Sequence, residues 1–190
     1  MSIATSTVST TQETTRSTWQ IDPAHSLVEF SVRHMMVSTV KGRFTTIQGT
    51  ILDVADDPTR SSVEVVIDPA SITTGDDKRD AHLRSPDFFD VEQYPTITFK
   101  SRRIEGARDQ FTLTGDLTMH GVTREVSLDA TFNGLGTNPW GKTVAGFSAE
   151  TRINRKDWDL NWNVGLEAGG VLVSDQLKIS VEIQAVRADQ

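Results

Sequence analysis

The sequence predicts an all-β protein, an eight-stranded antiparallel up-and-down barrel with a short helical insert between strands. Apolar and polar residues alternate with a period of two in about eight segments, as in half-buried strands. Most of these segments are separated by short turns, and one charged segment, residues 71–94, interrupts the alternation. About eight strands closed on themselves give a barrel that is either filled by side chains or holds one small ligand.

The first half of the chain supplies three of the predicted strands. Residues 27–34 place their apolar side chains and His34 on one face, so His34 is expected to face the interior. Residues 43–54 change face midway, which predicts a bulge near Gly49. Residues 63–67 alternate again. The remaining strands are predicted within residues 97–100, 111–119, 126–132, 145–153 and 177–185.

The charged insert is expected to contain a short helix. Asp76 and Asp77 can cap its N-terminus, the helix should end at Arg84, and Pro86 prevents its continuation. Within the insert, an Arg79, Asp80 and His82 cluster is expected to pin the segment against the barrel, with a ligand gate or an acid–base group as alternatives.

Two long connections are predicted. Residues 133–142 contain three glycines and a proline and indicate a plain surface loop. Residues 154–175 carry Trp158, Trp162 and several aliphatic residues, which need to be buried by something, so this connection is expected to fold over a barrel mouth.

Length and composition favour one folded domain. Residues 1–18, of which eleven are Ser or Thr, are expected to form a disordered tail, and residues 19–190 the folded domain. The sequence shows neither the apolar run of a secretory signal peptide nor an apolar run long enough to span a membrane. We therefore expect a cytoplasmic protein without stable membrane insertion, or a periplasmic or secreted one if the chain is a processed form.

Charge and residue types exclude several functional classes. The net charge of −7 argues against nucleic acid or an anionic membrane surface as a partner. The absence of cysteine excludes disulfides and zinc–thiolate sites. The four histidines lack the close spacing of metal ligands, so we expect no metal and favour hydrogen-bonded structural roles over a ligand contact or a haem ligand.

Several segments, in order along the chain, are similar to the YceI-like family. The similarity extends from Trp19 to about Arg187, and the one departure noted is Asp159, where the family often has glycine after an aromatic residue. The segments that carry it are WQIDPAHS at 19–26, FSVRHM at 30–35, VKGRF at 40–44, RDAHL at 79–83, DFFDV at 87–91, YP at 94–95, GDLTMHGVT at 115–123 and NRKDW at 154–158.

The resemblance implies a lipocalin-like barrel with a polyisoprenoid or similar long-chain lipid along its axis, often as a homodimer, and no established catalytic residues. No cofactor other than such a lipid is expected. Large aromatic and small residues alternate along the predicted inward faces, which is compatible with an elongated slot. The predicted ligand-binding residues are Phe30, Val32, His34, Met36, Phe44, Leu83, Phe88, Phe99, Leu117, Phe132, Phe147, Trp158 and Trp162.

The sequence is compatible with two alternatives to lipid binding. The barrel could be an enzyme or a haem-binding protein that uses a cavity histidine, His34 or His120. It could also be packed solid, as a structural module without a binding site.

Overall fold

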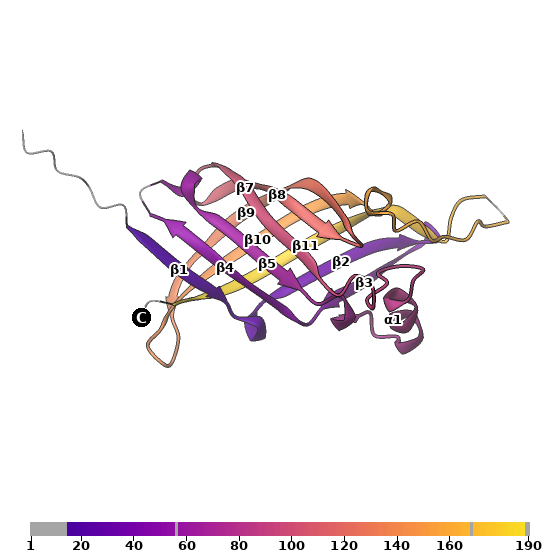
Figure 1. Cartoon of the computed structure of the whole chain (residues 1–190), viewed down its shortest axis with the longest axis horizontal. Helices are drawn as coiled ribbons and strands as arrows, with labels where there is room; N and C mark the ends of the chain where they lie inside the picture. Colours follow the sequence, from indigo (N-terminus) through magenta and orange to yellow (C-terminus); the bar gives the residue numbers. More distant parts are fainter. Residues whose placement is uncertain (1–14, 56, 168, 189–190) are drawn as a thin grey trace, which may run out of the picture.

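The computed structural model describes residues 15–55, 57–167 and 169–188, which form an elongated β-barrel (Figure 1). Most of the predicted tail, residues 1–14, lies outside the described residues, whereas residues 16–18 already belong to the first strand. The strands are β1 (Arg16–Ile21), β2 (Leu27–His34), β3 (Ser38–Phe44), β4 (Ile47–Val54), β5 (Ser62–Ile67), β6 (Ile72–Thr73), β7 (Ile97–Gly106), β8 (Gln110–Met119), β9 (Val122–Thr137), β10 (Thr143–Asn154) and β11 (Val173–Arg187).

One α-helix and four short 3-10 helices accompany these strands in the described part of the chain. They are α1 (Asp77–Arg84), η1 (Pro23–His25), η2 (Pro58–Arg60), η3 (Pro69–Ser71) and η4 (Arg155–Trp158). None of the helices described is long and apolar enough to cross a membrane.

Eight strands close the barrel, in the order β1-β4-β5-β7-β8-β9-β10-β11 and back to β1, and every neighbouring pair is antiparallel. The prediction of an eight-stranded antiparallel barrel is confirmed. Strand β11 pairs with β10 along one edge, and its other edge pairs first with β2, between Val173 and Glu182, and then with β1, between Ala185 and Arg187. Strands β2, β3 and β6 therefore lengthen the wall beyond the closing pair.

The predicted bulge near Gly49 is wrong. Gly49 pairs regularly with Val65, and the change of face arises because the chain breaks at Thr45 and Thr46 between β3 and β4. Both threonine amides donate to the Ser71 hydroxyl at 3.1 Å, so their hydrogen bonds leave the sheet ladder.

The predicted loop at 133–142 is shorter than expected. Strand β9 continues through a bulge at Asn133 to Thr137: Gly146 pairs with Gly134 and Phe147 with Phe132, which leaves Asn133 without an opposite residue. Only residues 138–142 connect β9 to β10.

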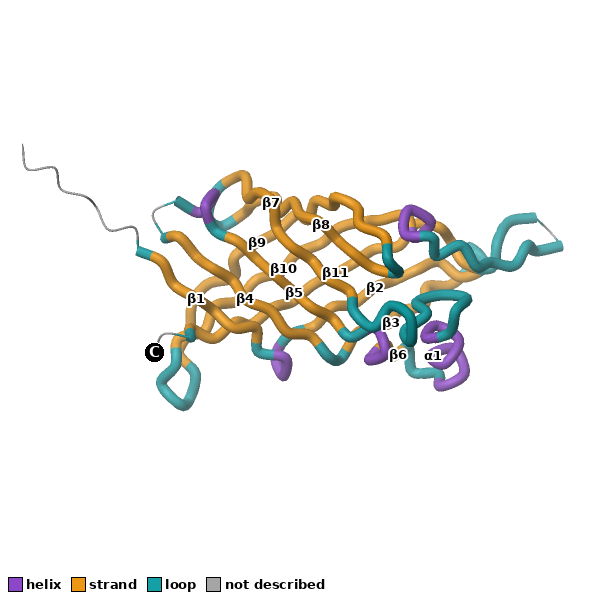
Figure 2. Tube along the Cα trace, in the orientation of Figure 1, coloured by secondary structure: helices purple, strands orange, loops and turns teal. Residues whose placement is uncertain are grey.

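Helix α1 has the predicted bounds. Asp76 Oδ1 accepts hydrogen bonds from the amides of Lys78 and Arg79, both at 3.0 Å, which satisfies the free donors at the helix start. The Arg84 guanidinium donates to the carbonyls of Ala70 and Ile72, both at 2.7 Å. These bonds attach α1 to η3 and β6 at one end of the barrel (Figure 2).

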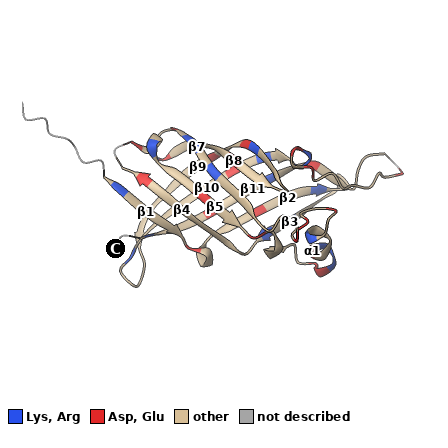
Figure 3. Ribbon diagram, viewed as in Figure 1, with Lys and Arg blue, Asp and Glu red and all other residues tan. Residues whose placement is uncertain are grey.

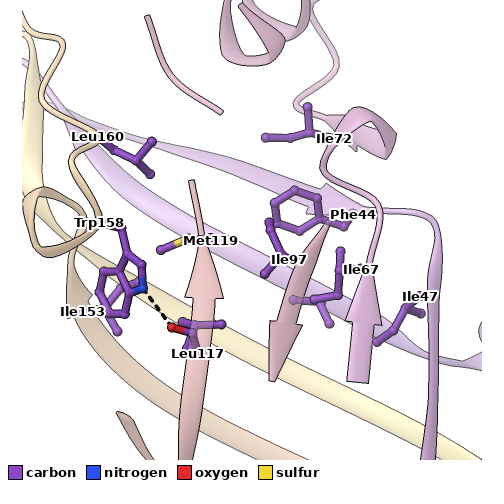
Figure 4. Close-up of a cluster of buried hydrophobic side chains, with 11 residues drawn as sticks. Phe44, Ile47, Ile67, Ile72, Ile97, Leu117, Met119, Ile153, Trp158 and Leu160 are labelled. Carbon is purple, nitrogen blue, oxygen red and sulfur yellow. Dashed lines mark hydrogen bonds between the residues drawn. The ribbon is translucent and has the colours of Figure 1, made fainter. Parts of the chain in front are cut away.

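The two ends of the barrel differ. The α1 end carries α1, the β2–β3 turn and the loop 159–172, whereas the hairpin end carries the β4–β5, β7–β8 and β9–β10 connections (Figures 1 and 2). The largest buried cluster, which includes Phe44, Ile97 and Leu117, lies at the α1 side of the interior (Figure 4). Two smaller clusters contain Trp19 and Ile104 respectively.

A candidate lipid-sized cavity inside the barrel

A cavity of about 480 Å³ lies inside the barrel and is lined by residues from all eight strands of the ring. At the α1 end its wall includes Leu83 and Phe88, and at the hairpin end it includes Pro58, Ala107 and Leu135. Its volume falls within the roughly 300–1,000 Å³ of small-molecule sites. The interpretation of a solid barrel is therefore wrong.

The lining is aromatic and aliphatic along the barrel, because the inward face of each strand carries the apolar half of its alternation. Large rings lie against small residues of the neighbouring strand. Phe111 pairs with Ala130, and Phe99 lies diagonally across from Gly115, where a methyl group would come within 2.6 Å of the ring. Phe132 pairs with Phe147, their ring centroids 5.4 Å apart. The predicted mixture of large and small lining residues is present.

At the hairpin end, charged groups reach the cavity wall. Arg108 lies 5.9 Å from the Phe132 ring centroid and 3.6 Å from an Asp53 carboxylate oxygen, and Arg187 lies 6.0 Å from the Trp19 ring centroid. Asp53 and both arginines line the cavity. The rings lie within the range for cation–π attraction.

At the α1 end, the buried Arg155 lines the cavity. Its guanidinium donates to the carbonyls of Leu160, Trp162 and Ser174 and to the Asp175 carboxylate. Burial lowers the pKa of Arg155, and the negative charge of Asp175 opposes this shift. Arg155 thus fastens both ends of the loop 159–172 to the barrel.

Nine of the thirteen predicted ligand-binding residues line the cavity. They are Phe30, Val32, Phe44, Leu83, Phe88, Phe99, Leu117, Phe132 and Phe147. All but Leu83 and Phe88 come from strands whose alternation marks them as inward-facing.

The other four do not line the cavity. Met36 is 62% exposed in the β2–β3 turn, and His34 is half-exposed where β2 ends. Trp158 is 2% exposed and packs in the core, its indole Nε1 donating to the Leu117 carbonyl at 3.0 Å (Figure 4). Trp162 lies behind the wall, its ring 5.2 Å from Phe88 and 4.7 Å from His82.

The aromatic connection covers the end of the barrel only with its first part, through Leu160 and Trp162, whereas Val164 and Val171 are exposed, contrary to the prediction that its apolar residues are buried. Trp162 packs on Phe88, and Phe88 is part of the cavity wall. His82 completes this layer, with its Nε2 2.7 Å from Asp87 Oδ2. The Arg79, Asp80 and His82 cluster is expected from the sequence to hold the insert against the barrel by ion pairs. Instead, Arg79 and Asp80 both form hydrogen bonds with Thr74, within the insert itself.

None of the four histidines, all of which lie in the described part of the chain, lines the cavity. His120 occupies the β8–β9 turn, with Nδ1 3.1 Å from the Trp158 carbonyl and its ring against Tyr94. His25 pairs with Asp22 at 2.8 Å. Within residues 15–55, 57–167 and 169–188, no group of three or more His, Asp or Glu residues is placed to hold a metal ion.

Several lining residues escaped the sequence prediction although a signal existed. Val65, Val126, Val181 and Ile183 stand on the same apolar faces as the predicted residues and line the cavity. Trp19 lies on β1, whose start fell within the predicted tail. The alternation within each strand identifies these positions once the strands are known to enclose a cavity.

Known proteins resemble the chain in sequence and in fold. A UPF0312 protein of Staphylococcus aureus is 37% identical over 165 residues, 86% of this chain and 94% of that protein. BcnA of Burkholderia cenocepacia has a similar structure, with a TM-score of 0.74 and 24% identity over 86% of this chain and 98% of its own. A domain from Saccharophagus degradans, described as polyisoprenoid-binding and implicated in plant cell wall breakdown, superposes with a TM-score of 0.68 and 17% identity over 89% and 98% of the two chains.

The sequence match to the YceI-like domain spans residues 19–185, from the middle of β1 to the closing end of β11. That range contains nearly the whole barrel together with α1 and the loop 159–172. The chain belongs to the YceI-like family.

Proposed function

We propose that the chain binds a long-chain apolar lipid, a polyisoprenoid or a similar molecule, inside the barrel, and that it carries or stores this lipid rather than transforming it. The observation that carries the proposal is the cavity of about 480 Å³ with aromatic and aliphatic walls between the two barrel ends. Such a wall offers hydrocarbon contact and few hydrogen-bonding groups, so it suits a tail rather than a polar metabolite.

The energetics favour a tail of considerable length. A ligand of this type gains about 0.3 kcal/mol per heavy atom after ordering costs, so about thirty carbons would bind with about 9 kcal/mol, in the submicromolar range. One methylene changes affinity only modestly in a hydrophobic pocket. The chain should therefore distinguish lipids by length and headgroup more than by the details of the tail.

The distribution of polar groups supports a carrier over an enzyme. Apart from Glu29 on β2, which pairs with Lys41, the charged residues of the wall lie near its ends. There Arg155 donates hydrogen bonds to four acceptors, and Arg108 lies beside Asp53. The alternative of an enzyme or haem protein depends on a cavity histidine, and none of the four histidines, all in the described part of the chain, is among the lining residues. The ligand class also agrees with the description of the Saccharophagus degradans domain as polyisoprenoid-binding.

Extraction of the purified protein with organic solvent, followed by mass spectrometry, tests the proposal directly. A long-chain lipid in near-stoichiometric amount is the expected result. The delipidated protein should then rebind a long-chain isoprenoid alcohol, measured by displacement of a fluorescent fatty acid. Absence of any lipid together with failure to bind these probes would overturn the proposal.

Two neighbouring residues of β5 provide a matched pair of variants. Val65 lines the cavity, whereas Val66 is 41% exposed on the outer face. Val65→Phe should reduce the capacity for a long tail because the larger ring occupies the cavity, and Val66→Phe should leave it unchanged. Circular dichroism checks that both variants keep the barrel. Equal binding by the two variants would contradict an interior site.

A further inference from the structure

Exposed apolar side chains gather at the α1 end of the barrel. Of the eight large hydrophobic residues that are exposed among the described residues, five lie on two loops there. These five form what we call the apolar tip: Met35 (45% exposed), Met36 (62%), Val37 (81%), Val164 (46%) and Val171 (37%). Scattered exposed hydrophobic residues are ordinary, but their concentration on adjacent loops indicates an interaction site.

The two loops of the apolar tip form one surface. The Met35 amide donates to the Leu172 carbonyl at 2.8 Å, and the Leu172 amide donates to the Val164 carbonyl at 2.9 Å. Gly165 and Val171 form an isolated antiparallel bridge that holds the second loop as a narrow extension. Figure 1 shows this extension projecting beyond the barrel next to the β2–β3 turn.

The backbone of the turn is held in an unfavourable conformation. Met35 and Met36 have φ values of 50° and 60°, in the left-handed region that glycine and asparagine adopt readily and methionine rarely does. The fold therefore tolerates two strained residues whose side chains reach solvent instead of burying apolar area. Such strain is found where a local conformation serves a function.

The apolar tip is continuous with the wall of the cavity. Val32 precedes the β2–β3 turn and Val173 follows the second loop, and both line the cavity. Val173 pairs with His34 across β2 and β11, directly behind the turn. A molecule in contact with the tip is thus adjacent to the α1 end of the cavity.

Charge distinguishes between the two partners that an apolar surface could have. Arg33 lies behind the turn and donates to the Met36 carbonyl at 2.8 Å and to the Thr39 hydroxyl at 3.2 Å; no carboxylate of the described chain forms a salt bridge with it. A symmetric pairing of two copies through this tip would bring two such guanidinium groups together. Phospholipid phosphates would instead pair with them.

We propose that the apolar tip docks on the surface of a phospholipid bilayer, with Met36 and Val37 among the acyl chains and Arg33 at the level of the phosphates. The net charge of −7 repels anionic membranes, so contact is confined to the tip. The two loops carry two acidic residues, Asp159 beside η4 and Glu167 on the projecting part. In Figure 3 the charged residues lie over the strands and α1, and the projecting loops are mostly uncharged. Docking would bring membrane lipid to the α1 end of the cavity, and this consequence rests on the proposed function. The docking itself does not depend on that function.

Flotation with phosphatidylcholine vesicles tests the docking. The full chain is expected to float with the vesicles, and the double variant Met36→Asn/Val37→Ser to partition about tenfold more weakly, since two apolar side chains are removed. Asparagine accepts the left-handed conformation, so the turn should keep its shape. Trp140→Ser is the matched control, because Trp140 is as exposed as Val37 (81%) but lies at the hairpin end.

Three results would overturn the docking: no flotation of the wild-type chain, equal flotation of the double variant, or an equal loss with Trp140→Ser. A dimer that dissociates in the double variant without any vesicle binding would assign the tip to a second copy instead. Displacement of the fluorescent fatty acid in the absence of vesicles separates this inference from the proposed function. The double variant should retain that binding, because neither residue lines the cavity.

Discussion

The ring of Phe30 lies over Gly42, its partner across β2 and β3: a methyl group at Gly42 would come within 2.3 Å of Phe30 Cζ. A similar close approach occurs between Phe99 and Gly115, which lie diagonally across β7 and β8, since Phe99 pairs with Leu117: a methyl group at Gly115 would come within 2.6 Å of Phe99 Cζ. In both pairs the glycine leaves room for an aromatic ring to lie close to the wall. The rings therefore line the cavity of about 480 Å³ without filling it.

Gly42→Ala should reduce the affinity for a long tail while the barrel stays folded. The three atoms nearest to the added methyl group belong to the side chains of Phe30 and Thr74, so these can move while the backbone remains in place. A displaced Phe30 ring enters the cavity, and we expect about tenfold weaker binding of a long isoprenoid alcohol, equivalent to about 1.4 kcal/mol. Displacement of a fluorescent fatty acid measures this change.

Gly136→Ala is the control for this substitution. Its methyl group would meet Val144 Cγ2 at 3.5 Å, an ordinary contact, and Gly136 does not line the cavity. Tail affinity should be unchanged. An equal loss in both variants would show that the effect arises from a general disturbance of the sheet rather than from Phe30.

The alternation of residues within strands predicted the barrel and most of its lining, because a strand closed into a barrel turns one of its two faces inward. His34 shows the limit of this rule. It has the same parity as Phe30 and Val32, yet it lies half-exposed at the end of β2 and does not line the cavity, although its partner Val173 does. Parity gives the side on which a residue lies, whereas its depth depends on which distant strands pair with it.

Contacts between distant segments account for the other differences. The break at Thr45 and Thr46 depends on the Ser71 hydroxyl, and the buried place of Trp158 depends on the Leu117 carbonyl. Asp159, where the family often has glycine, has a φ of 59°, which explains why glycine suits that position. Local sequence patterns carry no information about such partners.

Arg155→Met should destabilise the barrel strongly. The substitution leaves the carbonyls of Leu160, Trp162 and Ser174 without their donor in a buried setting. Loss of a buried charged partner of this kind costs about 3–5 kcal/mol in free energy of unfolding. Urea denaturation followed by circular dichroism measures the change. A loss below about 1 kcal/mol would contradict the role of Arg155 as the fastener of the loop 159–172.

Lys156→Met is the matched control, since Lys156 pairs with the same carboxylate of Asp175 from the surface, at 3.0 Å. Exposed ion pairs contribute about 0–1 kcal/mol. Lys156→Met should therefore leave the free energy of unfolding nearly unchanged. A large loss of unfolding free energy in this variant would show that the pairing with Asp175, rather than the hydrogen bonds to the buried carbonyls, stabilises the loop.

Trp162→Ala should accelerate release of a bound lipid. The indole supports Phe88 from behind at a centroid distance of 5.2 Å, and Phe88 closes part of the cavity wall. Without this support Phe88 gains freedom to move, and the α1 end opens more often. Stopped-flow transfer of a fluorescent fatty acid to vesicles should show about tenfold faster dissociation, since most changes in affinity appear in the dissociation rate.

Trp140→Ala provides the comparison, because this exposed tryptophan lies on the β9–β10 connection at the opposite end. Its dissociation rate should match that of the wild-type chain. If Trp140→Ala accelerated release and Trp162→Ala did not, the hairpin end would be the exit of the cavity.

Asp22→Asn should remove part of the loss of stability in acid. The pKa of Asp22 lies below its ordinary value of 3.8, chiefly because its carboxylate is hydrogen-bonded to His25; burial opposes this shift, and the Ala24 amide and the Gln184 side chain add to it. A carboxyl group with a lowered folded-state pKa stabilises the fold above its unfolded pKa. The contribution disappears as the pH falls through the folded-state pKa.

The difference in Tm between the wild-type chain and Asp22→Asn should therefore be larger at about pH 5 than at lower pH, where it shrinks. The pair is partly exposed, so the contribution should stay below about 1 kcal/mol. Asparagine still caps η1, which confines the change to the charge. His25→Ala should reproduce the altered pH dependence because it removes the main cause of the shift. Parallel Tm curves of all three proteins between neutral and acidic pH would exclude a contribution of Asp22 to acid unfolding.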